Sequence, residues 1–211
     1  MPEWIKDSDS GIYQAYGTFF LRTQHPFVRR LKRYYSPSAH GTRAWQSSFV
    51  LIDYLQHEPP EVAPKLMDLG CGWSAVGVHA AVHWQAKVTG VDIDPNVFPY
   101  MHLLASLNHV KIIERNVDFA HLETAELAAQ DIIVGADICY WDGLIDPLQL
   151  VIEIAMSNGV SRIVLADPGR PTFYELAARC ETKWNTELRR WYAVEPNRYT
   201  GEILEIQPLG S

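Results

Sequence analysis

Short apolar runs alternate with longer amphipathic stretches from residue 65 onward. The runs are rich in Val, Ile or Leu, which is typical of strands buried on both faces of a parallel sheet. The stretches between them repeat apolar residues at helical spacing, and Gly159 closes the last of them as a helix C-cap would. The predicted strands lie at 65–70, 87–93, 110–114, 131–137 and 162–167, and the predicted helices at 73–84, 96–108, 122–129 and 146–159.

The repeated strand–helix order predicts a doubly wound, mostly parallel, Rossmann-like α/β sheet, because crossovers between parallel strands are right-handed. A further helix is expected near 171–183. Beyond it, strand-like runs at 186–195 and 201–209 are joined only by a short turn-rich segment, which predicts an antiparallel hairpin. The expected sheet therefore has seven strands and ends in a hairpin. Residues 1–44 show no strand pattern and are predicted to be a helical extension, which leaves 45–211 as the main domain.

The composition is that of an ordinary globular protein, with 47% apolar and 20% charged residues. No apolar run approaches the roughly 18 residues of a membrane span, so no membrane contact is expected. The acidic N-terminus is unlike a signal peptide, and we expect a cytoplasmic protein. A formal net charge of −7 argues against nucleic acid as a partner, since phosphate binding needs a basic face. None of these features predicts the oligomeric state.

Cysteines and a cluster of cations add little chemistry of their own. Cys71, Cys139 and Cys180 lie far apart without a CxxC pair, so we expect reduced thiols and no metal site. Four cations fall within residues 29–33, which span one or two helical turns. Such a run is typical of a solvated helix face, and a docking patch for an acidic partner is the alternative interpretation.

A glycine-rich turn follows the first predicted strand. Gly70, Gly72 and Ala75 fit the GxGxx(G/A) pattern, in which small residues let a ligand lie against backbone N–H groups at a helix N-terminus. Asp92 comes twenty residues after Gly72, at the end of the second strand, where a carboxylate accepts hydrogen bonds from ribose hydroxyls. Together these residues predict a cofactor of adenosine type.

Asp68 distinguishes between two adenosine cofactors that such a crevice accepts. A carboxylate at the strand tip suits the cationic amino group of S-adenosylmethionine and would repel the pyrophosphate of a nicotinamide dinucleotide. The terminal hairpin and the absence of a second substrate domain also favour S-adenosylmethionine. Asp118, just past the third strand, has two interpretations: it accepts a hydrogen bond from the adenine amino group, or it caps the segment that follows.

Five motifs follow one another along the chain: LMDLGCG, VTGVDIDP, VDFAHL, DIIVGADICY and RIVLADPGR. In this order and spacing they resemble the motifs of class I, seven-β-strand S-adenosylmethionine-dependent methyltransferases, over about residues 40–208. More narrowly, the chain is similar to the protein-lysine methyltransferases, whose members carry an Asp-x-x-Tyr type motif after the fourth strand. The likeness is to the lysine methyltransferases of electron-transfer flavoprotein β-subunit and their bacterial relatives, and it is carried by AWQSSFVLIDYL, DICY and ADPGRPTF.

The resemblance implies methyl transfer to a protein lysine, and it places Trp45 over the cofactor. A tryptophan on an amphipathic helix is as readily a core residue, so both interpretations stand. The chain departs from the family at Ser74, where many members have Gly or Thr, and at Pro99, which could interrupt or delay a helix. Asn108 resembles the asparagine at the end of that helix. The expected cofactor-binding residues are Trp45, Asp68, Gly70, Cys71, Gly72, Asp92, Ile93, Asp118 and Ala136.

Asp137 and Tyr140, at the end of the fourth strand, are the expected catalytic residues. Methyl transfer from a sulfonium needs an in-line nucleophile, so the main task is to position and desolvate the acceptor. A carboxylate and a tyrosine at this edge would hold an ammonium and then orient the neutral amine, and aromatic rings favour nearby cations. The alternative is a cap for the next helix, but Asp142 is better placed for that role.

Three further residues are expected to contact the acceptor. Trp141 would form a wall of the pocket, and Asp167 and Arg170 would line it from beyond the neighbouring strand. An ion pair with a local acid is the alternative for Arg170. The acceptor is predicted to be an amine, with a lysine of a protein as the first choice; the alternatives are N- or O-methylation of a small molecule and a cofactor-binding module without transfer activity. Asp68 and the hairpin argue against a nicotinamide-dependent oxidoreductase.

Overall fold

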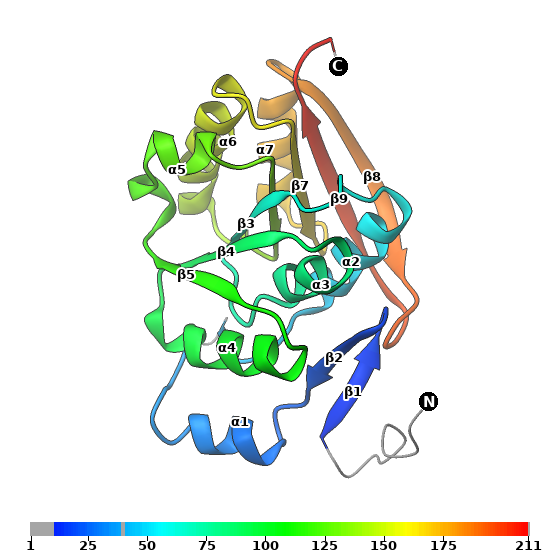
Figure 1. Cartoon of the computed structure of the whole chain (residues 1–211). Coiled ribbons are helices and arrows are strands. Elements are labelled where there is room, and N and C mark those ends of the chain that lie inside the picture. Colours follow the sequence, from blue (N-terminus) through cyan, green and yellow to red (C-terminus); the bar gives the residue numbers. More distant parts are fainter. Residues whose placement is uncertain (1–10, 39–40, 211) are drawn as a thin grey trace.

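One seven-stranded sheet runs through the middle of the molecule, with helices on both sides (Figure 1). The computed structural model describes residues 11–38 and 41–210. The strand order is β5-β4-β3-β6-β7-β9-β8; neighbours from β5 to β7 are parallel, and β9 is antiparallel to both β7 and β8. The strands are β3 (Lys65–Leu69), β4 (Lys87–Asp92), β5 (Ile112–Asn116), β6 (Ile132–Ala136), β7 (Arg162–Asp167), β8 (Asn185–Ala193) and β9 (Tyr199–Gln207).

Helices fill the connections that the sequence pattern assigns to them, which confirms the predicted α/β order. Pro99 does not break its helix, because it lies in the first turn of α4, where a backbone N–H has no partner to lose. Gly159, with φ of 98°, follows the last residues of α6 as expected. The helices are α2 (Gln46–His57), α3 (Ala75–Trp84), η3 (Pro95–Val97), α4 (Phe98–Leu107), η4 (Phe119–His121), α5 (Thr124–Ala128), η5 (Asp142–Leu144), α6 (Ile145–Ser157) and α7 (Pro171–Glu181).

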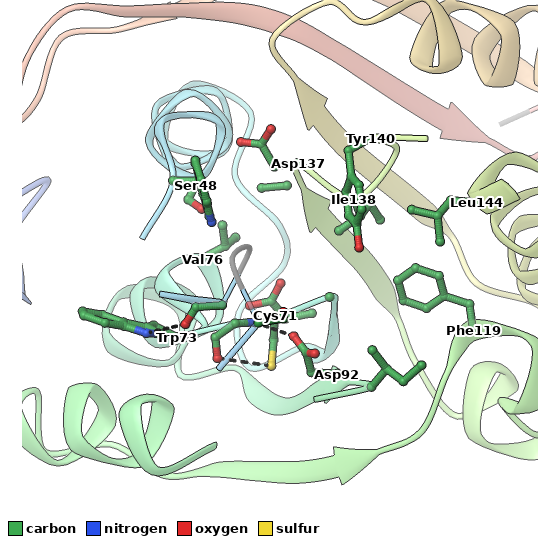
Figure 2. A pocket seen from close by; sticks show the side chains of 18 of the residues that line it. Ser48, Cys71, Trp73, Val76, Asp92, Phe119, Asp137, Ile138, Tyr140 and Leu144 are labelled. Atoms are coloured by element: carbon green, nitrogen blue, oxygen red, sulfur yellow. Dashed lines mark hydrogen bonds between the residues drawn. The ribbon is translucent and has the colours of Figure 1, made fainter. Parts of the chain in front are cut away.

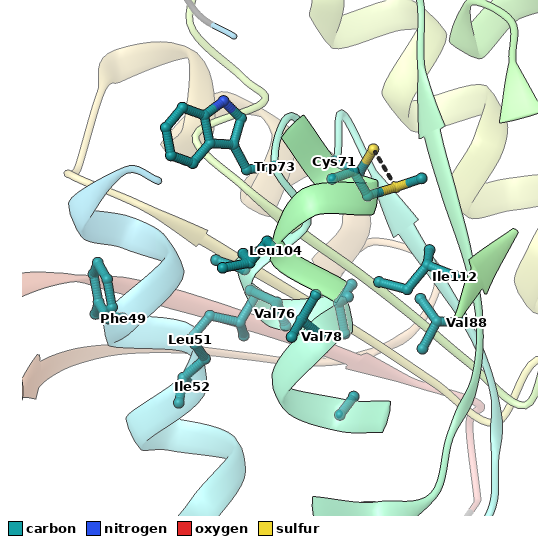
Figure 3. Packing of buried hydrophobic residues seen from close by; sticks show 14 of the residues in the cluster. Phe49, Leu51, Ile52, Cys71, Trp73, Val76, Val78, Val88, Leu104 and Ile112 are labelled. Carbon is teal, nitrogen blue, oxygen red and sulfur yellow. Dashed lines mark hydrogen bonds between the residues drawn. The ribbon is translucent and has the colours of Figure 1, made fainter. Parts of the chain in front are cut away.

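Two apolar cores lie on opposite faces of the sheet, because successive strand residues point to opposite sides. Leu66 packs into the core that contains residues of α2, α3 and α4, whereas its neighbour Met67 packs into the core beneath α5, α6 and α7. Figure 3 shows the first core, where Leu51, Val76 and Leu104 come from three different helices. Burying each such side chain contributes about 1.5 to 3 kcal/mol. The sheet is therefore covered on both faces, as its continuous apolar strands predict.

The N-terminal segment contains strands, so the predicted helical extension is wrong over residues 12–21. β1 (Ile12–Ala15) and β2 (Thr18–Leu21) form an antiparallel hairpin, and the α-helix α1 (Pro26–Leu31) follows it. Tyr16 and Gly17 both have positive φ, as a two-residue hairpin turn requires. Strands of four residues with one partner are too short to leave a clear pattern, which is why the sequence reading missed them.

Polar contacts fasten this hairpin to the main domain. Asn108, the C-cap of α4, donates to Phe19 O at 2.8 Å through Nδ2 and accepts from Phe19 N at 2.9 Å through Oδ1. The Tyr16 hydroxyl donates to Asp53 Oδ2 at 2.6 Å and accepts from the backbone N–H of Val194 at 2.8 Å. The N-terminal hairpin is therefore held against both α4 and the end of β8.

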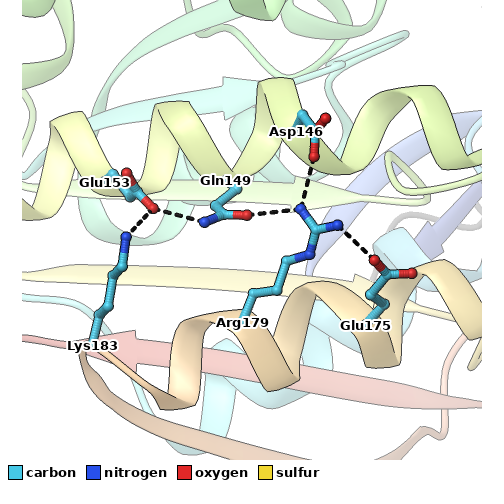
Figure 4. Close-up of polar contacts among 6 residues, drawn as sticks. All are labelled: Asp146, Gln149, Glu153, Glu175, Arg179 and Lys183. Carbon is cyan, nitrogen blue, oxygen red and sulfur yellow. Dashed lines mark hydrogen bonds and ion pairs between the residues drawn. The ribbon is translucent and has the colours of Figure 1, made fainter.

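The surface between α6 and α7 carries a polar network (Figure 4). Arg179 contacts Asp146 and Glu175, and Lys183 contacts Glu153. Exposed pairs of this kind contribute roughly 0 to 1 kcal/mol each, so the network has little weight beside the apolar cores. Within residues 11–38 and 41–210, no helix is long and apolar enough to cross a membrane.

Candidate active site

A pocket of about 500 Å³ opens at the carboxyl ends of β3, β4 and β6 (Figure 2). Parallel strands present their carboxyl ends at one edge, so loops that are far apart in sequence meet there. The predicted site residues that line the pocket are Trp45, Asp68, Gly70, Cys71, Gly72, Asp92, Ile93, Asp118, Ala136, Asp137, Tyr140 and Arg170. Trp141 and Asp167 are not among its lining residues.

The glycine turn presents an open stretch of backbone to this pocket. Gly70 and Gly72 have φ of 58° and 51°, a left-handed conformation that favours glycine. A Cβ at Gly70 would lie 2.6 Å from Ile138, whereas one at Gly72 would meet no atom within 4 Å. Gly70 thus allows close packing beneath the turn, and Gly72 leaves room for a ligand above it.

Asp68 is a nearly fully buried carboxyl at the tip of β3. Its Oδ2 accepts hydrogen bonds from Ser74 Oγ at 2.7 Å and from Gly77 N at 3.2 Å. Burial raises the pKa of Asp68 to about 7, against these hydrogen bonds, and the charge of Asp92 adds to the rise. A cationic amino group in the pocket would favour the ionised form, so the residue fits the role predicted from its position.

Asp92 supports the turn from the end of β4. Its Oδ2 accepts from Gly72 N at 2.9 Å and its Oδ1 accepts from Asp94 N at 2.9 Å. Burial raises the pKa of Asp92, although both hydrogen bonds oppose the rise. Each carboxylate oxygen can accept further hydrogen bonds, so contact with ribose hydroxyls remains compatible with these contacts.

Trp45 and Asp118 were each given two interpretations. Trp45 is the N-cap residue of α2 and lines the pocket, half-buried, with the Arg43 guanidinium 4.3 Å from its ring centroid. The core interpretation is therefore wrong for Trp45. Asp118 caps η4 by accepting from His121 N at 3.1 Å and also lines the pocket, so the cap is confirmed and contact with adenine remains a prediction.

Asp137 follows β6 in a left-handed conformation, with φ of 63°. Its Oδ1 lies 2.8 Å from Arg170 Nη1, yet this buried oxygen accepts no hydrogen bond of good geometry from the described residues. The contact between Asp137 and Arg170 is therefore an ion pair. Ser48 and Tyr140 flank Asp137 in the pocket (Figure 2).

Tyr140 also points into the pocket, and its phenol oxygen faces the side where Asp92 lies (Figure 2). Burial, with a smaller contribution from Asp92, raises the pKa of Tyr140. Trp141, in contrast, is 59% exposed and lies outside the pocket, with its ring 5.1 Å from that of Tyr140. The prediction that Trp141 forms a pocket wall is wrong, because the chain turns outward after Tyr140. Asp142 does not cap a helix either, since Trp141 is the N-cap of η5 and α6 has no side-chain cap.

Asp167 and Arg170 act together at the end of β7. Asp167 is 1% exposed and accepts from the backbone N–H of Gly169 and Arg170, and its Oδ2 lies 2.6 Å from Arg170 Nη1. The prediction that Asp167 lines the pocket is wrong; it holds Arg170 from behind. Burial alone would lower the pKa of Arg170, but its pairing with Asp137 and Asp167 outweighs burial and raises it. The ion pair of Arg170 with local acids is therefore confirmed; Arg170 also lines the pocket, and its contact with the acceptor stays a prediction.

Apolar residues that were not among the predicted site residues complete the pocket. Phe119, Ile138 and Leu144 line the space, and the polar side chain of Ser48 lines it too. Phe119 and Ile138 stand beside predicted site residues, so their sequence positions were the available signal. Apolar side chains next to a motif usually belong to the core, and only the fold shows which of them face a cavity.

Solved methyltransferase structures share this fold. Precorrin-6y C5,15-methyltransferase from Geobacter metallireducens matches with a TM-score of 0.60 at 12% identity, over 83% of this chain and 95% of that chain. M. jannaschii TYW2, solved in complex with AdoMet, matches with a TM-score of 0.56 at 12% identity, over 94% of this chain and 86% of that chain. The seven-stranded sheet with its terminal hairpin is therefore a Rossmann-like methyltransferase fold of class I.

The model of the lysine methyltransferase family matches residues 31–172, more than half of the chain, and the chain belongs to this family. Electron transfer flavoprotein beta subunit lysine methyltransferase of Mus musculus is 31% identical over 133 residues, covering 61% of this chain and 50% of that protein. The Homo sapiens protein of the same name is 27% identical over 130 residues, covering 61% and 49%. The chain spans about half the length of the curated relatives it matches. Its cofactor is S-adenosylmethionine.

Proposed function

We propose that this chain transfers a methyl group from S-adenosylmethionine to the side-chain amine of a lysine in another protein. The observation that carries the proposal is that Asp137 and Tyr140 face the same pocket as the glycine turn, from the edge of the neighbouring strand. Membership of the lysine methyltransferase family supports lysine as the acceptor. The names of the electron transfer flavoprotein relatives support a lysine that belongs to a protein.

Residues of the glycine turn and its neighbouring acids would hold the cofactor. Asp68 is suited to the amino group of the methionine part, and Asp92 to the ribose hydroxyls. Apolar Ile93 and Phe119 offer surfaces for the adenine ring. When bound, S-adenosylmethionine supplies an electrophilic methyl group on a cationic sulfur.

Asp137 would receive the lysine as an ammonium ion. The buried Oδ1 of Asp137 is compensated by its ion pair with Arg170 but accepts no hydrogen bond from the described residues, so it can still accept one from an ammonium donor. Arg170 can turn away from Asp137 without losing its charge partner, because Asp167 also binds it. The site therefore contains an acid whose present partner is exchangeable.

The amine must then lose a proton, since only its neutral form has a lone pair. At a pKa near 10.4, deprotonation at pH 7 costs roughly 4 to 5 kcal/mol in water, and desolvation in the pocket reduces that cost. Tyr140 keeps its own proton at neutral pH, because its pKa is raised. Its hydroxyl would therefore orient the amine by hydrogen bonding, and the proton would leave through Asp137 to solvent.

Incubation of the protein with tritiated S-adenosylmethionine and fractionated cell lysate tests the proposal. We expect label in a protein band, and methylated lysine after acid hydrolysis of that band. Label only in small molecules would overturn the protein acceptor in favour of a metabolite. Binding of S-adenosylmethionine by isothermal titration, with no label in any fraction, would instead identify a binding module.

A further inference from the structure

Cations gather in the N-terminal part of this acidic chain. Residues 11–52 contain six Lys or Arg and no Asp or Glu, although the formal net charge of the whole chain is −7. Four of the six lie on or just after α1, where they are exposed to solvent. The other two, Arg22 and Arg43, line a second cavity of about 270 Å³. These two arginines are thus the part of the cationic region that encloses a space.

This second cavity adjoins the candidate active site. Arg43 and Ala44 line both spaces, so the two cavities lie next to each other on either side of the loop before α2. The far wall comes from Asn197, in the turn between β8 and β9, and from Tyr199, the first residue of β9. Because β9 pairs antiparallel with β7, with Glu202 opposite Asp167 at the end of β7, Tyr199 extends past the carboxyl end of β7. The second cavity therefore lies at the sheet edge that carries Asp137.

Neither arginine has an acidic partner among the described residues. The Arg22 guanidinium lies 5.1 Å from the ring centroid of Tyr13, and that of Arg43 lies 4.3 Å from the ring centroid of Trp45. By contrast, Arg162, Arg170 and Arg179 are all paired with carboxylates. Stacking on a ring restrains a guanidinium while leaving its N–H groups free, and that fork of donors matches a carboxylate.

We propose that this cavity binds an acidic side chain of the methyl-accepting protein. The target lysine would then be selected by an Asp or Glu that reaches Arg22 and Arg43 while the lysine reaches Asp137. The inference rests on the proposed function, and it specifies the acceptor as a lysine with an acidic neighbour. The cavity of about 270 Å³ is smaller than the pockets of about 300 to 1,000 Å³ that hold small-molecule ligands, so its volume suits a single side chain.

A peptide panel tests this inference by binding alone. Each peptide carries one lysine in a Gly-Ser-Ala background and one Glu at a different offset from it, with a matched peptide carrying Gln at that offset. Affinities are measured by fluorescence anisotropy with S-adenosylhomocysteine present, at 0.15 M salt, where fields beyond about 8 Å are screened. We expect the Glu peptide to bind at least tenfold more tightly than its Gln partner at a narrow set of offsets.

Two variants that each remove one cation separate the cavity from the general field. Arg22→Gln should reduce the preference for Glu to less than threefold, and Arg43→Gln should do the same. Arg29→Gln, on the exposed face of α1, should keep the preference, and unchanged thermal melting would show that all three variants fold. An equal loss in Arg22→Gln and Arg29→Gln would overturn the cavity in favour of a long-range field.

Two further results of the peptide measurements would bear on the acidic-side-chain site. Equal binding of Glu and Gln peptides at every offset, or a preference that survives in both Arg22→Gln and Arg43→Gln, would overturn the inference. Transfer is measured separately, with tritiated S-adenosylmethionine and the same peptides and lysate. A preference for Glu without label in any acceptor would overturn the proposed function and leave the acidic-side-chain site intact.

Discussion

The two halves of the pocket are built in different ways. On the cofactor side, Asp68 and Asp92 accept hydrogen bonds from Ser74, Gly77 and Gly72, all within one strand–turn–helix–strand segment. On the acceptor side, Asp137 depends on Arg170, which comes from the loop after the next strand. The first half is held mainly by backbone N–H groups close in sequence, and the second by an ion pair between two loops.

This difference follows from what each half must do. Backbone donors are fixed by the fold, so carboxylates bound to them stay in place while a cofactor arrives. A side-chain ion pair can exchange one cation for another, and a lysine ammonium could replace Arg170 at Asp137. The rigid half of the pocket therefore suits a constant ligand, and the exchangeable half suits a variable one.

The largest effect is expected for Asp137→Asn. Asn tolerates the left-handed conformation at this position, so the fold should survive while the charge that holds the ammonium is lost. Methyl transfer should fall on the order of a thousandfold, and the Kd for S-adenosylmethionine should change less than threefold. Tritium transfer and isothermal titration measure the two quantities.

Asp142→Asn is the matched control, because Asp142 is an exposed acid five residues further along the chain. It should retain transfer within twofold of the unmodified protein. Loss of cofactor binding in Asp137→Asn, with transfer surviving at excess cofactor, would contradict the division of the pocket into two halves.

Arg170→Gln should have an intermediate effect. Removing the guanidinium leaves Asp137 and Asp167 without their shared cation, so both the melting temperature and the positioning of Asp137 should suffer. Transfer should fall about 10- to 100-fold, with little change in cofactor affinity. Arg179→Gln removes an arginine outside the pocket that is half-buried like Arg170 and also contacts two acids, and it should leave transfer unchanged. Equal melting temperatures for both variants would argue against a structural role for Arg170.

On the cofactor side, affinity should depend on pH through Asp68. Its pKa of about 7 is above the value near 3.9 of an unfolded chain, so the free protein holds a proton there below pH 7. Protonated Asp68 therefore contributes to the free energy of unfolding of the free protein at low pH, and this contribution is lost as pH rises from about 4 to 7. Binding a cationic amino group requires the ionised form. Affinity for S-adenosylmethionine should rise with pH up to about 7, by as much as tenfold per pH unit, and then level off.

Titration calorimetry in buffers of different ionisation enthalpy measures the proton that binding releases near pH 6. The pKa of Asp68 also depends on the groups that face it, which are Ser74, Gly77 and Asp92. The control is therefore Asp68→Asn, which removes the titrating carboxyl itself, and in this variant the pH dependence of affinity should disappear. A flat affinity for the unmodified protein between pH 5.5 and 8 would show that Asp68 does not meet the amino group.

The smallest effect is expected for Asp118→Asn. Its carboxylate already contacts both the backbone N–H and the ring of His121, and an asparagine can keep the cap. The Kd for S-adenosylmethionine should change less than threefold by isothermal titration. A tenfold loss of affinity would favour the adenine interpretation over the cap alone.

The sequence predicted the cofactor side of the pocket better than the acceptor side. Local spacing and side-chain chemistry specify the buried strands, the glycine turn, Asp68 and Asp92, so the sequence predicted all of them. The N-terminal hairpin was not, since its strands are short and are held by contacts such as the pair between Phe19 and Asn108. Trp141 and Asp167 were placed in the pocket from their position in the chain alone, and the fold turns the first outward and buries the second.

By itself, the sequence determined the order of strands and helices from residue 65 onward, the glycine turn and the carboxylates at the strand ends, because apolar periodicity and backbone conformation act over a few residues. Tertiary structure alone decided that Arg170 faces Asp137, that Trp45 faces the pocket, and that Arg22 and Arg43 share a second cavity. Those contacts join segments that are far apart in the chain. Their geometry depends on how the loops meet at the sheet edge, and no local pattern encodes that meeting.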